Sequence, residues 1–213
     1  QDIIRRWDFD KEPPGHVPSG FTGVARGATV PGSWRVQEDA RAYSAPNVLH
    51  HGAHCQADPC LSLLAGESLD FAFPDATVQL VVTERAEDGG AGIVMWERGG
   101  PTAYAVVLNP AAKLVNFFRV RGSQVELLAS EVVRLSKDRW HSLRVQRVNY
   151  AHVNRPRLAA YVDGHQVAVT PDEVIPAIER VGLVVQGSTA ASFDSLHVAD
   201  MVTNRPLSAP AAY

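Results

Sequence analysis

Long apolar runs, runs of like charge and cysteines are all scarce in this 213-residue sequence. No apolar stretch approaches the ~20 residues that a membrane-spanning helix needs, and segments such as VQLVV and LVNFF have the length of strands. The 20 Lys and Arg are balanced by 23 Asp and Glu without a basic run, which argues against nucleic-acid binding. We therefore expect neither a membrane span nor a nucleic-acid partner.

Sequence motifs of enzyme chemistry are also missing. There is no G-x-S-x-G elbow, no glycine-rich phosphate loop, and no E-x-D-x-E-like spacing of the kind that sandwich glycosidases use for their paired carboxylates. The nearest approach is WDFDKE, which would place Asp8, Asp10 and Glu12 on one face if extended. Because this segment precedes Pro-Pro, a solvated edge or a cation site is favoured over a catalytic pair.

Helical periodicity is weak and is confined to residues 171–181, where Pro176 would interrupt any helix longer than a turn. Strand-like runs fill most of the chain, and the breaks between them carry Gly, Pro, Asp or Asn. Asp163-Gly164 is the clearest hairpin turn, because these residues accept positive φ at low cost. This regular alternation of strand-like runs and turns predicts an all-β fold, a two-sheet antiparallel jelly-roll sandwich of at least ten strands. The runs are 76–84, 90–97, 102–109, 113–121, 140–148, 157–164, 165–170, 180–187 and 191–200.

The two ends of the chain differ from the middle. Residues 1–33 are rich in Pro and Gly, and we expect an irregular N-terminal segment packed on the sandwich. Residues 34–200 form the jelly-roll domain in this interpretation. Residues 201–213 are rich in Pro and Ala and predict a C-terminal tail along the surface.

Three histidines and both cysteines lie within the eleven residues HHGAHCQADPC, 50–60. Cys55 and Cys60 are only five positions apart in a turn-like segment, which fits a small disulfide loop in an oxidising compartment. The sequence also begins at Gln1, as a mature chain does after loss of a signal peptide. We therefore expect a periplasmic or secreted protein.

The same cluster admits a metal site. His50 and His51 would point to opposite faces of a strand, but Gly52 permits a bend that brings His51 and His54 together on zinc or copper. Reduced cysteines would add thiolates to such a site, whereas an oxidising compartment favours the disulfide. A third reading makes the histidines hydrogen-bonding groups that line a groove for a polar ligand.

Several motifs occur in a familiar order, with their best anchors at Trp34, Trp140-His141, Asp163-Gly164 and Phe193-Asp194. This order resembles the exported bacterial domains of concanavalin A-like or laminin G-like fold in the sugar hydrolase-like group, which is related to 3-keto-disaccharide hydrolases. These anchors mark a fold rather than a catalytic site, so the resemblance implies a jelly roll more than an activity. The similar segments are 32–49, 90–109, 139–147, 161–167 and 180–198.

The chain departs from that family at positions that often carry charge. Trp96 stands where an arginine often follows a strand, and Val107, ahead of Asn109, occupies a second arginine position. Gln186 and Ser188 stand where a lysine and an aspartate are common. A carbohydrate groove that has lost these charges favours a non-catalytic role.

These observations predict an exported, non-catalytic binding or accessory module that holds a carbohydrate or a protein partner on its concave sheet face. The candidate ligand-binding residues are Trp96, Asn109, His51 and Gln186, with Trp96 partly exposed as a flat face for a sugar ring. Most of the aromatic residues in the expected strands are expected in the core; these residues are Trp34, Trp96, Tyr104, Trp140 and Tyr161. The alternatives are a glycoside-active hydrolase and a metal-binding exported protein that uses residues 50–60.

The resemblance also implies a structural calcium, because sandwiches of this superfamily often tie their first and last strands together in this way. Asp10 and Asp194 are the candidate ligands. The favoured alternative is that Asp194 caps a strand or bonds backbone at the sheet edge.

Overall fold

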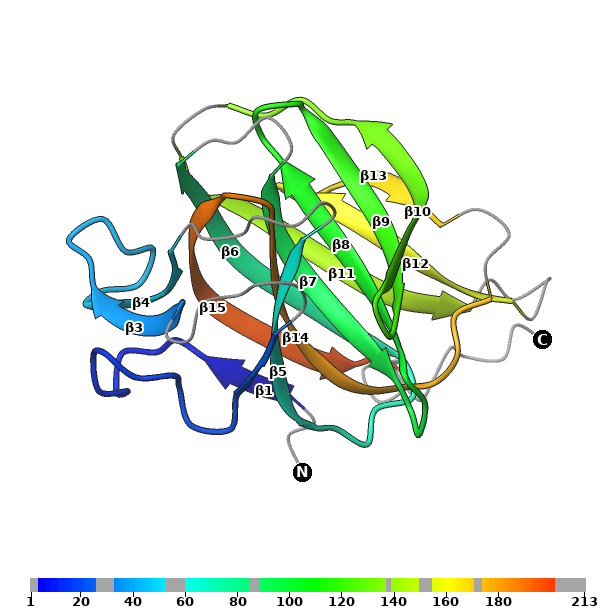
Figure 1. Ribbon diagram of the computed structural model, residues 1–213, viewed down its shortest axis with the longest axis horizontal. Helices are drawn as coiled ribbons and strands as arrows, with labels where there is room; N and C mark the ends of the chain where they lie inside the picture. The colour runs from blue at the N-terminus through cyan, green and yellow to red at the C-terminus, as the bar shows by residue number, and fades with distance from the viewer. Residues whose placement is uncertain are drawn as a thin grey trace, which may run out of the picture.

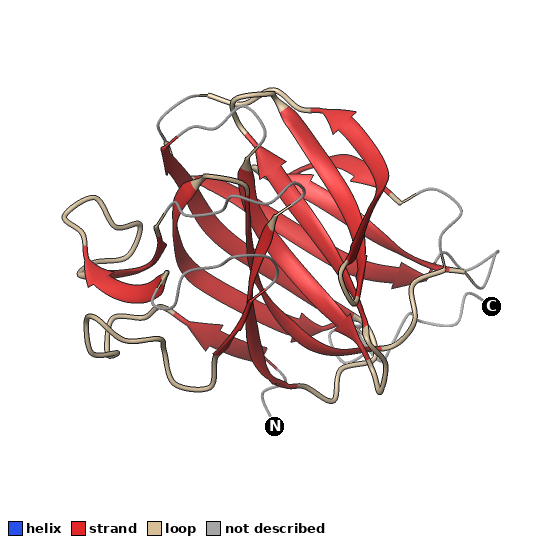
Figure 2. Ribbon diagram, viewed as in Figure 1, coloured by secondary structure: helices blue, strands red, loops and turns tan. Residues whose placement is uncertain are grey.

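The computed structural model consists of strands, turns and loops in the residues that it describes, which are 4–25, 33–52, 60–84, 89–136, 139–149, 155–170 and 174–201 (Figure 2). The described residues contain no helix that could cross a membrane. The strands are β1 (Ile4–Trp7), β2 (Thr22–Ala25), β3 (Trp34–Glu38), β4 (Asn47–His51), β5 (Leu61–Ser68), β6 (Pro74–Glu84), β7 (Gly90–Glu97), β8 (Thr102–Asn109), β9 (Leu114–Arg121), β10 (Gln124–Val132), β11 (His141–Asn149), β12 (Pro156–Val162), β13 (His165–Val169), β14 (Ile178–Gln186) and β15 (Ala190–Asp200).

The strands form two antiparallel sheets that stack as two layers (Figure 1). The eight-stranded sheet has the order β13-β12-β11-β6-β15-β4-β3, and β1 also pairs with β15. The seven-stranded sheet has the order β10-β9-β8-β7-β14-β5-β2. The predicted two-sheet antiparallel sandwich is therefore confirmed, and residues 178–181, where a helical turn was the most we expected, belong to β14.

The core lies between the sheets and follows from strand alternation. On β8, Tyr104, Val106 and Leu108 point into it, and Phe117 and Phe193 are among its largest fully buried side chains. Burial of each such phenylalanine stabilises the fold by about 2 kcal/mol.

The two outer faces of the sandwich differ in character. The outer face of the seven-stranded sheet carries a second apolar cluster, in which Val94, Val107 and Val184 are fully buried. The outer face of the eight-stranded sheet, which we call the polar outer face, carries half-buried side chains such as Thr77 and Arg144. The polar outer face therefore offers hydrogen-bonding groups to solvent along the middle of its strands.

The N-terminal segment is more regular than expected. β1 pairs with β15 of one sheet and β2 pairs with β5 of the other, so residues 4–25 contribute one short strand to each layer. Both strands have only four residues, too few for a clear apolar rhythm. Residues 202–213, most of the expected tail, lie outside the described residues.

The hairpin between β12 and β13 turns at Asp163 and Gly164, as predicted. Their φ angles are 49° and 82°, the left-handed region that a two-residue hairpin turn requires. Asp163 also uses its side chain beyond the turn, because its Oδ1 accepts a hydrogen bond from Ser142 N at 3.0 Å.

Candidate functional site

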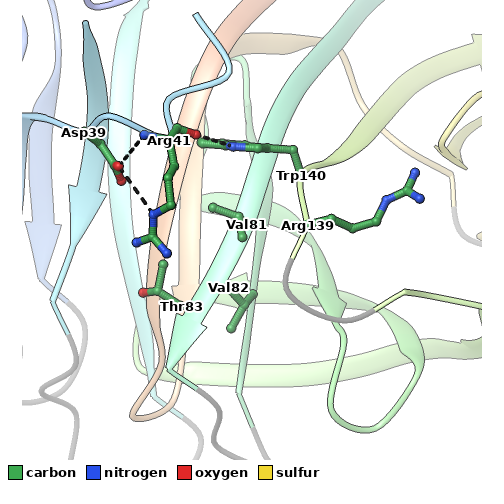
Figure 3. Close-up of a pocket in the computed structure, with 7 residues that line it drawn as sticks. All are labelled: Asp39, Arg41, Val81, Val82, Thr83, Arg139 and Trp140. Atoms are coloured by element: carbon green, nitrogen blue, oxygen red, sulfur yellow. Dashed lines mark hydrogen bonds and ion pairs between the residues drawn. The ribbon is translucent and has the colours of Figure 1, made fainter. Parts of the chain in front are cut away.

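A cavity of about 220 Å³ opens beside the end of β6, between the loop that follows β3 and the residues that precede β11 (Figure 3). Val81 and Thr83 continue the outward-facing series of β6 that includes Thr77, so the cavity adjoins the polar outer face. Its lining residues are Asp39, Arg41, Val81, Val82, Thr83, Arg139 and Trp140.

Trp140 supplies the largest apolar surface of this cavity and is held from two sides. Its indole Nε1 donates a hydrogen bond of 2.8 Å to the carbonyl oxygen of Arg41. Its ring meets the edge of Tyr43, with centroids 6.2 Å apart and planes at 64°. Since Tyr43 is 57% exposed, the two rings form an aromatic surface beside the cavity.

The residues after Trp140 fix its backbone. His141 is buried, and its Nδ1 and Nε2 lie 2.7 Å from Asp163 Oδ2 and 2.8 Å from Ser136 O. Burial by itself would raise the pKa of Asp163, but hydrogen bonds from His141 and Ser142 outweigh it and the pKa is lowered. The backbone next to Trp140 is thus tied to the β12–β13 hairpin.

The polar groups of the cavity come mainly from the loop after β3. Arg41 N donates to Asp39 Oδ1 at 2.8 Å, and Arg41 Nε lies 3.7 Å from the same oxygen. The Arg41 side chain is 86% exposed, and an ion pair of this kind contributes under about 1 kcal/mol, so it can rearrange around a ligand. In Figure 3 the Arg139 side chain points away from the other labelled side chains.

Trp140 is a site residue that the sequence analysis did not single out. It was one of five aromatic residues of which most were expected in the core, but β11 begins at His141 and Trp140 lies half-buried at the cavity. The signal was present in the alternation, since Leu143 is in the core and Trp140 is in phase with Ser142 and Arg144 instead.

Three of the candidate ligand residues, Trp96, Asn109 and Gln186, lie on the outer face of the seven-stranded sheet, whereas His51 lies between the sheets. Trp96 is half-buried and packs against the second apolar cluster. Gln186 is half-buried, and its buried Oε1 has no hydrogen-bond partner in the described part of the chain. Both belong to the seven-stranded sheet, on the opposite side of the sandwich from the Trp140 cavity.

Asn109 and His51 are buried, and their side chains make hydrogen bonds within the fold. Asn109 is 4% exposed, and its Oδ1 accepts a hydrogen bond from Ala112 N in the turn after β8. His51 is 1% exposed between the sheets, with Nε2 3.0 Å from Ser62 Oγ and its ring against Trp34 at 4.8 Å. Neither side chain has surface to offer a ligand in this conformation.

The histidine cluster is divided by the sheet. His50 Nδ1 lies 3.1 Å from Ser192 Oγ, on the face of β4 opposite to His51, so the two imidazoles do not converge. His54 and Cys55 lie outside the described residues. Cys60 is buried and is not a free thiol. The Cys55–Cys60 disulfide and a metal at His54 stay predictions.

Asp10 and Asp194 meet at the segment before β4. Ser44 N donates to Asp194 Oδ2 at 2.6 Å, while Ser44 Oγ donates to Asp10 Oδ2 and Asn47 N donates to Asp10 Oδ1, both at 3.0 Å. The favoured expectation, that Asp194 bonds backbone, is confirmed. The two carboxylates fasten the N-terminal segment and β4 to β15.

The surroundings of this pair also fit a hard cation such as Ca²⁺. Burial raises the pKa of Asp194 to about 6, the charge of Asp10 adds to the increase, and hydrogen bonds from Ser44 and Ser195 oppose it. Asn47 Oδ1 is buried without a partner in the described residues. Oxygen ligands from Asp10, Asp194 and Asn47 would hold the ion, which would lock the same three segments together.

The other acidic residues of WDFDKE serve local bonds. Asp8 Oδ1 accepts from Asp10 N at 3.1 Å, and Glu12 Oε2 accepts from both Ser19 N and Ser19 Oγ at 3.2 Å. Neither carboxylate lines the Trp140 cavity. The structure therefore does not make them a pair across a cleft.

The fold is shared with solved carbohydrate-binding and glucanase domains. The carbohydrate-binding module CBM66 from Bacillus subtilis superposes with a TM-score of 0.59 at 15% identity, over 85% of this chain and 96% of that one. A lichenase derived from a mouse hindgut metagenome gives 0.56 at 12% identity, over 93% and 99%. The carbohydrate recognition domain of Emp47p gives 0.51 at 13% identity, over 93% and 95%.

No protein-family model matches the sequence, and no curated protein matches it either. At these identities the structural likenesses establish the fold alone. The chain is a two-sheet antiparallel jelly-roll sandwich.

Proposed function

We propose that this chain is a non-catalytic carbohydrate-binding module of an exported protein, with its sugar site at the Trp140 cavity. The observation that carries the proposal is an indole fixed at the mouth of a cavity that also presents a guanidinium, a carboxylate and a hydroxyl group. A sugar ring stacks its apolar face on an aromatic ring and directs its hydroxyls to such polar groups.

The carboxylates favour binding over hydrolysis. A glycosidase places two carboxyl groups roughly 5–10 Å apart across the scissile bond. Among the described residues, Asp39 is the one carboxylate that lines the Trp140 cavity, and it is engaged by the backbone and side chain of Arg41. Asp39 then serves as a hydrogen-bond acceptor for sugar hydroxyls.

Two further observations support the proposal. CBM66 and the Emp47p domain, which share the fold, are described as a carbohydrate-binding module and a carbohydrate recognition domain. Export is favoured because Cys60 is not a free thiol and Cys55 is the one other cysteine in the sequence. A disulfide between them requires an oxidising compartment.

Binding of a panel of soluble polysaccharides, measured by affinity electrophoresis and calorimetry, tests the proposal. We expect wild type to bind at least one, W140A to bind it at least about tenfold more weakly, and W140F to retain most of the affinity because it keeps an aromatic face. Release of reducing sugar by the wild-type protein would contradict the non-catalytic role. Equal affinity of W140A and wild type would show that the sugar does not bind at the Trp140 cavity.

A further inference from the structure

A row of side chains crosses the polar outer face away from the Trp140 cavity. Strand register aligns Arg6 with His197, His197 with Thr77, Thr77 with Arg144, and Arg144 with Tyr161. Residues directly opposite each other in antiparallel strands share a face. The row spans β1, β15, β6, β11 and β12, and four strand spacings of about 4.8 Å make it roughly 19 Å long.

The row faces solvent along its length. Its neighbours in sequence, including Leu196, Val198 and Val78, are buried in the core, so the aligned residues point outward. Arg6 and His197 are exposed, and the Arg144 side chain is 43% exposed.

Arg6 and His197 form one end of the row. The structure gives neither side chain a hydrogen bond or ion pair with a described residue. They lie close enough that the charge of Arg6, added to the larger effect of burial, lowers the pKa of His197. An anionic oxygen group between the two would relieve this repulsion and accept hydrogen bonds from both, with the arginine fork suited to a carboxylate or a sulfate.

Arg144 and Tyr161 form the other end. Asp75 holds Arg144 by two hydrogen bonds of 2.8 and 2.6 Å, and the guanidinium lies 5.5 Å from the centroid of the Tyr161 ring. Gln146 Nε2 donates to the same carboxylate at 3.1 Å. This end is nearly neutral and rigid, with a half-buried aromatic ring at the surface.

We propose that this row binds an acidic polysaccharide, with a carboxylate or sulfate group between Arg6 and His197 and the sugar chain crossing the strands toward Tyr161. The inference rests on the proposed carbohydrate-binding function and names its ligand class. The row and the Trp140 cavity share one face, since Thr77 and Val81 are four residues apart on β6, roughly 13 Å.

The test compares matched ligands and matched variants of the full chain by calorimetry. The ligands are polygalacturonate and its methyl ester, which differ in the charge of the carboxyl group, and dextran sulfate and dextran. The variants are R6Q/H197Q and the control R180Q/H16Q, which removes the same residue types from exposed positions outside the row. The first ligand pair reports a carboxylate preference and the second a sulfate preference.

We expect wild type and R180Q/H16Q to bind an acidic polymer at least tenfold more tightly than its neutral counterpart, and R6Q/H197Q to lose that preference. Equal affinity of wild type for acidic and neutral forms would overturn this inference and leave the proposed function intact. Equal losses in both variants would overturn it as well. Failure of wild type to bind any neutral or acidic glycan would overturn both proposals.

Discussion

The two outer faces of this sandwich were built from different sequence patterns. On β8, the run TAYAVVLN is buried at all eight positions. Its even-numbered apolar residues fill the core, and its odd-numbered apolar residues belong to the second apolar cluster. On β11, the first five residues, HSLRV, alternate, so Leu143 and Val145 are in the core while Arg144 is partly exposed. A continuous apolar run therefore marks the covered face, and an alternating strand marks the face where a ligand can bind.

The largest expected effect comes from introducing one aspartate on each outer face of the sandwich. V107D would bury a carboxylate in the second apolar cluster, and we expect it to lower the free energy of unfolding by more than about 4 kcal/mol. T77D, on the polar outer face, should change it by less than about 1 kcal/mol. Urea unfolding followed by circular dichroism measures both, and similar losses would show that the faces are not distinct.

The next effect concerns two carboxylates, the buried Asp194 and the half-buried Asp10. If Ca²⁺ binds there, a concentration 100-fold above its Kd should stabilise the fold by about 2.7 kcal/mol. D194N should abolish the increase in Tm, whereas D70N, at an exposed aspartate, should leave it unchanged. A calcium response that survives in D194N would place the ion elsewhere.

Two half-buried tryptophans, Trp96 and Trp140, sharpen the comparison further. W96A should lower the unfolding free energy by about 2 kcal/mol, since the ring packs against the second apolar cluster. W140A should lower it by about 1 kcal/mol, because it loses one hydrogen bond and the contact with Tyr43. Thermal unfolding of the two variants in parallel shows which one is less stable. A larger loss of stability in W140A than in W96A would refute the claim that Trp96 is the more important of the two for packing.

The smallest expected effect is the pH dependence at the hairpin below the cavity. Because the folded-state pKa of Asp163 is lowered, its contribution is present above the unfolded-state pKa and is lost as pH falls through the folded-state pKa. D163N keeps a residue that tolerates positive φ, and should cost less than about 1 kcal/mol at pH 7 because the carboxylate is partly exposed. Unfolding at a series of pH values should show the two proteins converge in acid; a constant difference would exclude the ionic contribution.

Much of the fold was predictable because turns and strands are local. Asp163-Gly164 and the alternation of β11 could be recognised from short windows of sequence. β10 was missed because it is mostly exposed and lacks an apolar rhythm, and β1 and β2 because each has four residues. β5 was missed as well, although its first six residues are buried. The places of β10 and β1 depend on pairing with β9 and β15, which no local pattern contains.

The site was less predictable because it depends on distant segments. His51 was a candidate ligand by residue type, but its partner Ser62 comes from the opposite sheet and Trp34 from a neighbouring strand. Trp140 is brought to the surface with Arg41, 99 residues away in sequence. Such contacts follow from the packed sandwich, which a linear pattern does not encode.

The most direct test of the central claim, that the polar outer face and its cavity bind the sugar, is the Kd of W140A and W96A for the same polysaccharide. The account predicts that W140A binds at least about tenfold more weakly than wild type, while folded W96A binds within about twofold of it. Loss of binding in W96A with full affinity in W140A would contradict the account and assign the sugar to the face of the seven-stranded sheet.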